Sequence, residues 1–165
     1  MTTASRSRPH KRRSPFLPFA VVSLAVLGTA LSSSGFGQES GAQAGASTLD
    51  GVFTQEQVDR IASTYQRSCS ECHASDLGGS AMAPPLKGLP FMFFWQGKPL
   101  SELYTFLHDY MPLGNAGSLS NQAYADLVAL ILDANGFPAG DSELVPDVEA
   151  LAGIAIAPAP ATGGE

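Results

Sequence analysis

The sequence predicts a small all-α domain in which three or four helices are joined by long loops. Three segments, near residues 54–69, 99–111 and 120–135, place apolar residues at the spacing of one helix face. Glycine and proline interrupt the segments between them, which favours loops there. No two segments form a convincing strand pair, and 165 residues leave room for one ordinary domain.

The first predicted helix begins at Thr54. Thr54 and Gln57 stand at the N-cap and N3 positions of a capping box, and Phe53 and Val58 are placed to form its hydrophobic staple. One face of the helix is apolar and comprises Val58, Ile61, Ala62 and Tyr65. We expect the helix to pack through this face and to run into the segment around Cys69.

A second helix is predicted after Pro99, which suits a first helical turn. It should end at Met111, because a residue before a proline is disfavoured in the helical conformation. Its apolar face comprises Leu100, Leu103, Tyr104 and Leu107. Ahead of it, residues 76–88 are predicted to be a loop, followed by a dense aromatic cluster of Phe91, Phe93, Phe94 and Trp95.

The third helix has the clearest pattern. Ser118 or Ser120 can cap its N-terminus, and Gly136 is placed as its C′ residue. Its apolar stripe comprises Tyr124, Leu127, Val128, Ile131 and Leu132. Residues 141–165 then become acidic and finally rich in Ala and Pro. We expect an extended strap across the domain, with residues 158–165 disordered.

The N-terminus is predicted to be an export signal covering residues 1–37. A basic region precedes Phe16–Leu31, a nearly uncharged apolar run, and Gly35 and Gly37 are placed at a cleavage site. An uncleaved membrane anchor is the alternative, although a spanning helix needs roughly 20 apolar residues. Residues 38–50 are predicted to be a flexible spacer before a domain at residues 51–140.

Removal of the leader would leave an acidic protein. Five of the nine Lys and Arg residues precede residue 38, and none of the fifteen Asp and Glu residues does. The mature chain then carries four basic and fifteen acidic residues, a net charge of about −11. Such a charge argues against a nucleic acid partner and favours a protein partner with a basic docking patch.

The two cysteines of the chain are Cys69 and Cys72, and His73 follows directly. The pattern C-x-x-C-H is the signature of covalent haem attachment. Two thiols at this spacing can reach two vinyl groups on one edge of the porphyrin, and the next residue then presents its imidazole to the iron. We therefore predict one haem c per chain, bonded to Cys69 and Cys72, with iron ligated by His73.

Two other functions of a C-x-x-C pair fit less well. A thioredoxin-like dithiol belongs to a βαβ setting, which the sequence does not show. A zinc site with four ligands needs a further Cys or His, and beyond the motif the mature chain offers only His108. A small domain with long loops also buries little apolar surface by itself, so a porphyrin would supply the missing centre of its core.

The candidates for the second axial ligand are Met82, Met92, Met111 and His108. Met82 follows His73 closely, so its chain has little length to round the ring edge. Met92 falls in the aromatic cluster and is more easily explained as core, and His108 would give a bis-histidine site. Met111 is favoured, because it lies just after a helix and its thioether can hang from a loop.

Residues 52–140 resemble the class I c-type cytochromes, which are small electron carriers with one haem. The matching motifs, in the family's order, are Tyr65 with Cys69–His73, Ala83–Gly88, Trp95, Met111–Pro112, and the helix from Tyr124 to Ile131 ending at Asn135–Gly136. The attachment motif is specific, and the other motifs are individually weak. The family usually has Gly directly after the motif His, where this chain has Ala74.

The resemblance implies a fold in which N- and C-terminal helices cross beside the haem. It implies that Pro84 supplies a backbone carbonyl to the Nδ1–H of His73, and that Met111 is the distal ligand. Trp95 is then either a contact of a haem propionate or part of the core. The chain looks most similar to cytochromes that serve periplasmic dehydrogenases or terminal oxidases.

Three functions follow as hypotheses. The first is electron transfer by a soluble periplasmic carrier without catalytic residues, whose His/Met-ligated haem cycles between ferric and ferrous iron. The second is a haem-bearing subunit of a larger periplasmic dehydrogenase complex. The third is an open-site haem enzyme or gas sensor. Contact with a membrane is expected only if the N-terminal segment is retained.

Overall fold

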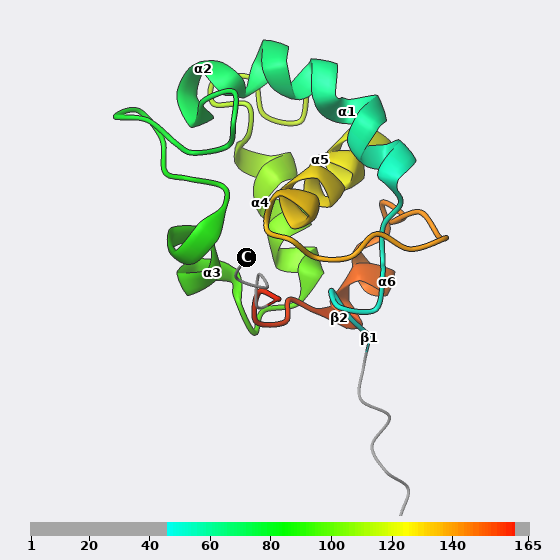
Figure 1. Cartoon of the computed structure of the whole chain (residues 1–165). Coiled ribbons are helices and arrows are strands. Elements are labelled where there is room, and N and C mark those ends of the chain that lie inside the picture. The colour runs from blue at the N-terminus through cyan, green and yellow to red at the C-terminus, as the bar shows by residue number, and fades with distance from the viewer. Residues whose placement is uncertain (1–45, 161–165) are drawn as a thin grey trace, which may run out of the picture. The chain divides into compact units, whose positions relative to one another are not determined.

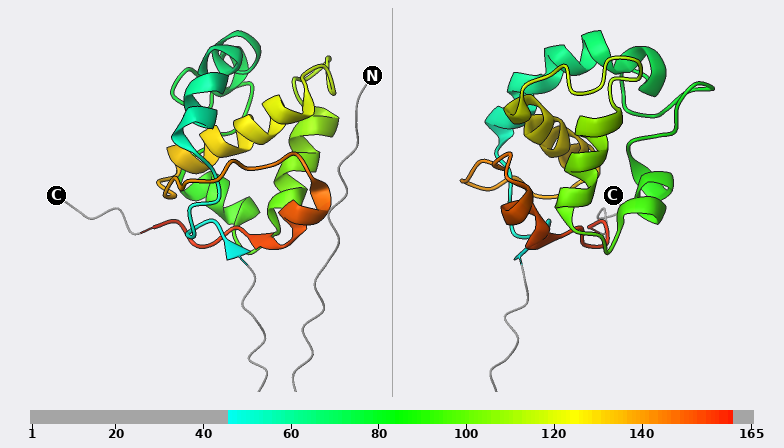
Figure 2. Two further views of the ribbon diagram at one scale, coloured as in Figure 1. Left: turned by 90° about the vertical axis from the view of Figure 1, so that its right-hand side faces the viewer. Right: turned by 180° about the vertical axis from the view of Figure 1, so that it is seen from behind.

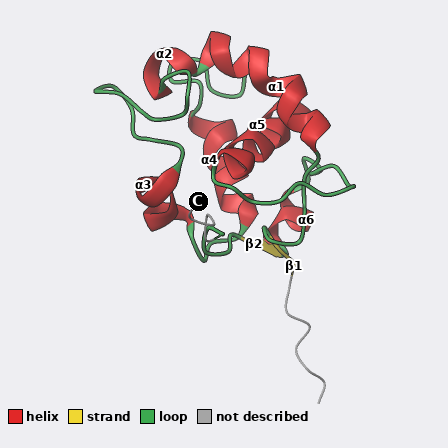
Figure 3. Ribbon diagram, viewed as in Figure 1, coloured by secondary structure: helices red, strands yellow, loops and turns green. Residues whose placement is uncertain are grey.

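The computed structural model describes residues 46–160 of the chain. The predicted leader, most of the predicted spacer and residues 161–165 lie outside the described residues. The elements are β1 (Ala46–Ser47), α1 (Gln55–Ser68), α2 (Ser70–His73), α3 (Gly88–Trp95), α4 (Leu100–Tyr110), α5 (Asn121–Ala134), α6 (Val148–Ala152) and β2 (Ile154–Ala155). The described part is mainly helical, as the sequence predicts (Figures 1 and 3).

Helices α1 and α5 form the most extensive helix pair of the fold, and α4 packs against α5 on another side. Figure 1 shows α5 beneath α1 and beside α4. Most residues of the predicted apolar faces lie between these helices, but Ala62, which the sequence assigns to the face of the first helix, is exposed. Ile61, Tyr65, Tyr124, Val128 and Leu103 are each at most 3 % exposed. Burial of these side chains is the main favourable term in holding the three helices together.

The predicted ends of these helices are confirmed. Thr54 and Gln57 form a reciprocal capping box at the start of α1, where Thr54 Oγ1 accepts from the Gln57 amide at 3.4 Å. Ser120, rather than Ser118, caps α5 and accepts from the Ala123 amide at 3.2 Å. Gly136 follows α5 with a φ of +79°, the left-handed conformation that glycine adopts most readily.

Helix α3 is not predicted by the sequence, which indicates only an aromatic cluster in this place. Its residues are apolar on all sides, so no face stands out by periodicity. Phe91 and Met92 point into the core, whereas Leu89, Phe93 and Phe94 are 87 %, 85 % and 65 % exposed. The helix therefore presents large apolar side chains on its outer surface.

The packed unit extends beyond residues 51–140, the range that the sequence assigns to the domain. Thr48 is completely buried, and so is Leu151 of α6, a helix that the sequence does not indicate. Strands β1 and β2 pair in parallel, which corrects the expectation that no strand pair occurs. Figure 2 shows the C-terminal strap running across α4 and α5 to reach β1.

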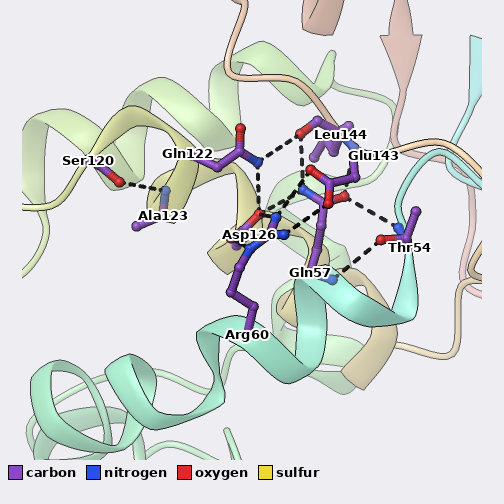
Figure 4. A network of polar contacts seen from close by, with 9 residues as sticks. All are labelled: Thr54, Gln57, Arg60, Ser120, Gln122, Ala123, Asp126, Glu143 and Leu144. Carbon is purple, nitrogen blue, oxygen red and sulfur yellow. Dashed lines mark hydrogen bonds and ion pairs between the residues drawn. The ribbon is translucent and has the colours of Figure 1, made fainter.

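A partly buried polar network fastens this strap to the helices (Figure 4). Arg60 of α1 donates to Asp126 of α5 at 2.7 Å and to Glu143 of the strap at 2.9 Å. Gln57 donates to Asp126 at 2.8 Å and to the Leu144 carbonyl at 3.0 Å. Burial alone would raise the pKa of Asp126, but the hydrogen bonds from Arg60, Gln122 and Gln57 outweigh it and lower that pKa.

No helix within residues 46–160 is long and apolar enough to cross a membrane. The longest of them, α1 and α5, each have 14 residues, and each has a polar side.

Candidate functional site

The cysteines of the C-x-x-C-H motif lie on a single helical turn at the end of α1. Cys69 ends α1 and also precedes α2, and its carbonyl accepts from the amides of Cys72 at 3.2 Å and His73 at 2.9 Å. Both cysteines are free thiols and are partly buried. The local fold thus presents two thiols and an imidazole from one short, hydrogen-bonded segment.

Burial, followed by the proximity of Cys72, raises the pKa of the Cys69 thiol to about 11. Catalytic and redox-active cysteines have the opposite setting, in which positive charge or a helix N-terminus lowers the pKa. Within residues 46–160, no three Cys, His, Asp or Glu side chains gather in a way that could hold a metal ion. Neither observation supports a dithiol oxidoreductase or a zinc site here.

The His73 ring has a defined orientation. Its Nδ1 lies 2.9 Å from the carbonyl oxygen of Pro84, and the residue is 9 % exposed. Because a carbonyl only accepts, Nδ1 carries the hydrogen and donates it. Nε2 is therefore the ring nitrogen whose lone pair is available to a metal, which is the arrangement that second-shell partners of ligating histidines impose.

Close backbone packing places Pro84 beside His73. Gly79 donates its amide to the His73 carbonyl at 2.9 Å. A Cβ added at Gly79 would come within 2.5 Å of the Pro85 nitrogen, so only glycine fits between these two segments. Gly79 also has a φ of +77°, which side chains disfavour. The sequence shows Gly78 and Gly79 only as loop residues and gives no sign of this contact.

Two residues from the crossing helices hold the same loop. The buried phenol of Tyr65 donates to the Ala74 carbonyl at 2.7 Å, directly after His73. Asn135, at the end of α5, donates to the Leu86 carbonyl at 3.0 Å and accepts from the Gly88 amide at 2.9 Å. Neither role is predicted from the sequence, which indicates only that Tyr65 lies on the apolar face of the first helix and that Asn135 lies at the end of the third.

Ala74 has an unusual backbone, with φ of 63° and ψ of 157°. This region is essentially restricted to glycine, because a Cβ clashes with the neighbouring backbone there. Ala74 stands where the family that the sequence resembles usually has glycine, and its backbone is therefore strained. The hydrogen bond from Tyr65 to the Ala74 carbonyl helps to hold this residue in place.

Met111 ends α4, as predicted. Its amide donates to the Leu107 carbonyl at 3.0 Å, and its own carbonyl accepts from the Tyr124 phenol at 2.8 Å. Its side chain is partly buried and packs against the same hydrophobic cluster that Cys69 contacts. The backbone of Met111 is thus fixed on both sides before any ligand is considered.

The other three ligand candidates have different surroundings. Met82 is 67 % exposed at the surface of the loop, and Met92 is 6 % exposed on the core side of α3. His108 has Nδ1 2.7 Å from Asp109 Oδ1, and its ring packs against Tyr104 and Tyr124. Met82 is therefore a surface residue, and Met92 belongs to the hydrophobic cluster against which Met111 packs.

Trp95 lies in a row of aromatic rings that sequence analysis only partly identifies. Its ring centroid is 6.3 Å from that of Phe91 and 5.6 Å from that of Phe106, and Phe106 in turn lies 5.2 Å from Tyr110. Trp95, Phe106 and Tyr110 line an open groove of about 350 Å³. Phe106 and Tyr110 lie on α4 outside its buried face. Two large aromatic side chains outside the predicted apolar face of a helix are the sequence feature that could have identified them.

These residues fit a covalently attached haem. Two unbonded thiols lie on one turn, His73 keeps one ring nitrogen free, and Met111 offers a thioether from a fixed backbone. Phe106, 41 % exposed, and Tyr110, 60 % exposed, add apolar surface of the kind that a porphyrin covers. An imidazole nitrogen and a thioether sulfur are both donors that haem iron accepts.

Comparisons with known proteins leave the family open. No protein-family model and no curated protein matches the chain. A solved structure, the sulfane dehydrogenase SoxCD from Paracoccus pantotrophus, is similar with a TM-score of 0.42 and 22 % sequence identity. The similar region covers 56 % of this chain and 55 % of the chain in the solved structure, so this chain spans about half the length of that one. At this level the likeness assigns no function.

Proposed function

We propose that this protein is an electron-transfer protein that carries one haem c, bonded to Cys69 and Cys72, with His73 and Met111 as axial ligands. The observation that supports the proposal most strongly is the hydrogen bond from His73 Nδ1 to the Pro84 carbonyl, at the end of a C-x-x-C-H turn. It prepares the histidine for a metal on Nε2 in a chain whose two cysteines stand free beside it.

When bound, the haem would supply a single iron centre that is reduced and oxidised by one electron. The task of the chain is then to hold the ligands still and to exclude water. The Pro84 carbonyl fixes the orientation of the His73 ring and leaves Nε2 as the free nitrogen. Tyr65 and Asn135 hold the loop that contains Pro84 against α1 and α5.

Met111 directly follows α4, and its backbone is bonded to Leu107 of α4 and Tyr124 of α5. A thioether ligand favours ferrous iron and raises the reduction potential relative to a second nitrogen ligand. If His73 and Met111 both held the haem iron, they would leave no position for a substrate, and the protein would act as a carrier and not as an enzyme or a gas sensor. The exposed aromatic side chains near Trp95 would then lie where apolar surface meets solvent.

The proposed partner is a redox protein with a basic docking surface, such as a periplasmic dehydrogenase, a cytochrome complex or a terminal oxidase. Residues 46–160 contain four basic and thirteen acidic residues, a net charge of −9. Attraction between opposite charges speeds association and weakens as salt is added. Transfer rates to such a partner should therefore fall with rising ionic strength, whereas salt-independent rates would argue against it.

An optical and potentiometric titration tests the electron-transfer proposal. The protein is expressed with its leader in a host that attaches haem c in the periplasm. We expect a reversible one-electron transition, a far-red ferric band from the Met–iron bond, and little binding of carbon monoxide by the ferrous form. Rapid carbon monoxide binding by wild-type protein would instead favour an open-site haem enzyme or sensor.

A further inference from the structure

The carbonyl of Met111 is fixed by a side chain that the resemblance does not include among the site residues. The phenol of Tyr124 lies on α5 and is completely buried, and its oxygen donates to the Met111 carbonyl at 2.8 Å. The bond links two elements, because Met111 ends α4 and Tyr124 lies in the first turn of α5.

We propose that Tyr124 is a positioning residue that holds Met111 on the iron, and this inference rests on the proposed function. The Met111 amide is already bonded to the Leu107 carbonyl at 3.0 Å. The next residue, Pro112, has no amide hydrogen, so it cannot add a second anchor at that point. The hydrogen bond from Tyr124 is therefore the contact that fixes the carbonyl group of Met111.

The surroundings of Tyr124 make the bond difficult to replace. The ring packs beside His108, with centroids 5.0 Å apart, and α5 is held against α1 by the core. Water has little access to a residue that is 0 % exposed. A Met111 carbonyl without the phenol would lose its hydrogen-bond partner in a partly buried place, and leaving such a group unpaired has a cost in free energy.

A thioether is a weak ligand of iron. Small changes in the free energy of the conformation in which Met111 is bound therefore decide how often its thioether leaves the iron. When Met111 leaves, its segment must move, and movement breaks the Tyr124 bond. Without the phenol, the state with Met111 dissociated becomes more populated. An added ligand that binds only this state should then bind more tightly by the same factor.

Thr48 provides a matched control. It is completely buried, and its hydroxyl accepts from the Ala157 amide at 3.0 Å. This bond joins the segments that carry β1 and β2 and involves none of the proposed haem ligands. Thr48→Val therefore removes one buried hydrogen bond away from the site and should leave the release of Met111 unchanged.

The experiment measures imidazole binding to the ferric haem protein in wild type, Tyr124→Phe and Thr48→Val, with thermal unfolding as a test of folding. Loss of one buried hydrogen bond should make imidazole bind about fivefold more tightly to Tyr124→Phe. The far-red band should weaken in the same variant. Thr48→Val should bind imidazole as wild type does, although it unfolds at a lower temperature.

The outcomes separate the inference from the proposed function. Wild-type protein without covalent haem would refute both. Wild-type protein with a Met–iron band, combined with equal imidazole affinity in Tyr124→Phe, would refute the inference alone. Equal tightening in both variants would show a general loss of stability and would also refute it. Should Tyr124→Phe fail to fold, Tyr124→Leu removes the phenol with a smaller side chain and is judged by the same measurement.

Discussion

The Nδ1 atom of His73 lies 2.9 Å from the carbonyl oxygen of Pro84, eleven residues further along the chain. The contact exists because Gly79 lets the two segments approach, and a Cβ there would come within 2.8 Å of the Pro84 carbonyl carbon and 2.5 Å of the Pro85 nitrogen. A glycine without a chemical role of its own thereby determines the orientation of the proposed iron ligand.

Gly79→Ala should lower both the stability of the protein and the integrity of the site. The substitution forces an alanine to a φ of +77° and also pushes Pro84 and Pro85 away from His73. The strained backbone costs about 1–2 kcal/mol, and the clash adds about 1–3 kcal/mol. Denaturant unfolding of the two proteins measures the difference in the free energy of unfolding.

Gly97→Ala is the control for this substitution. Gly97 has a similar φ of +82°, but no atom lies within 4 Å of the position that a Cβ would occupy. Its loss of stability should be limited to the backbone term of about 1–2 kcal/mol. Equal losses in the two variants would mean that Gly79 is needed for its conformation only, and not for the approach of Pro84.

Ala74→Gly should stabilise the protein by about 1 kcal/mol. Ala74 has φ of 63° and ψ of 157°, which glycine adopts without the clash of a Cβ. Ala62→Gly is the matched control, because Ala62 is exposed within α1 and glycine there should destabilise by about 1 kcal/mol. The midpoints of thermal unfolding should move in opposite directions, and a fall in both would contradict the strained conformation of Ala74.

Asp126→Asn should destabilise the protein by about 2 kcal/mol near neutral pH, because the charged hydrogen bonds to Arg60 and Gln57 are weakened. The folded-state pKa of Asp126 is lowered below its unfolded value. Its contribution is therefore complete above the unfolded pKa of about 4 and is lost as the pH falls through the folded pKa. The difference between wild type and variant should shrink in acid.

Asp133→Asn serves as the control for charge. Burial, and then the repulsion of Asp59, raise the pKa of Asp133. Its ionised form is therefore disfavoured in the folded protein, and the amide should be neutral or slightly stabilising at neutral pH. Urea unfolding between acid and neutral pH measures both variants. A gap between Asp126→Asn and wild type that does not change with pH would contradict the assignment.

Met111→Ala should keep the covalent haem but lower the reduction potential and open the iron to carbon monoxide. His108→Ala should leave the potential and the far-red band in place, because Met111 is the proposed ligand and the His108 ring packs against Tyr104 and Tyr124. Potentiometric titration of both variants distinguishes the candidates. A potential that is unchanged in Met111→Ala and altered in His108→Ala would transfer the ligand role to His108.

The sequence predicts those features that depend on short-range patterns. The capping box of Thr54, the end of α4 at Met111 and the glycine after α5 are local, and the structure has each of them. Helix α3 is missed, because a segment that is apolar on every side has no period. The bonds of Tyr124 to Met111 and of Asn135 to Leu86 join distant segments, and one sequence carries no signal for such pairs.

In the C-terminal strap, the sequence likewise does not predict which apolar residues are buried. Leu144 and Ile156 are buried as an extended strap would require, yet Val145 is 50 % exposed. The difference arises from the polar network, because Leu144 is fixed by hydrogen bonds with Gln57 and its neighbour is then turned outward. A pattern of apolar residues indicates that the segment packs, but not which of them face the core.

The most direct test of the proposed haem attachment is the intact mass of the exported protein, together with a count of its free thiols. We expect the mass of the chain plus one haem after denaturation, no reactive thiol, and a loss of pigment yield in Cys72→Ala. A colourless wild-type protein of unmodified mass, with both cysteines free to react or joined to each other, would contradict it.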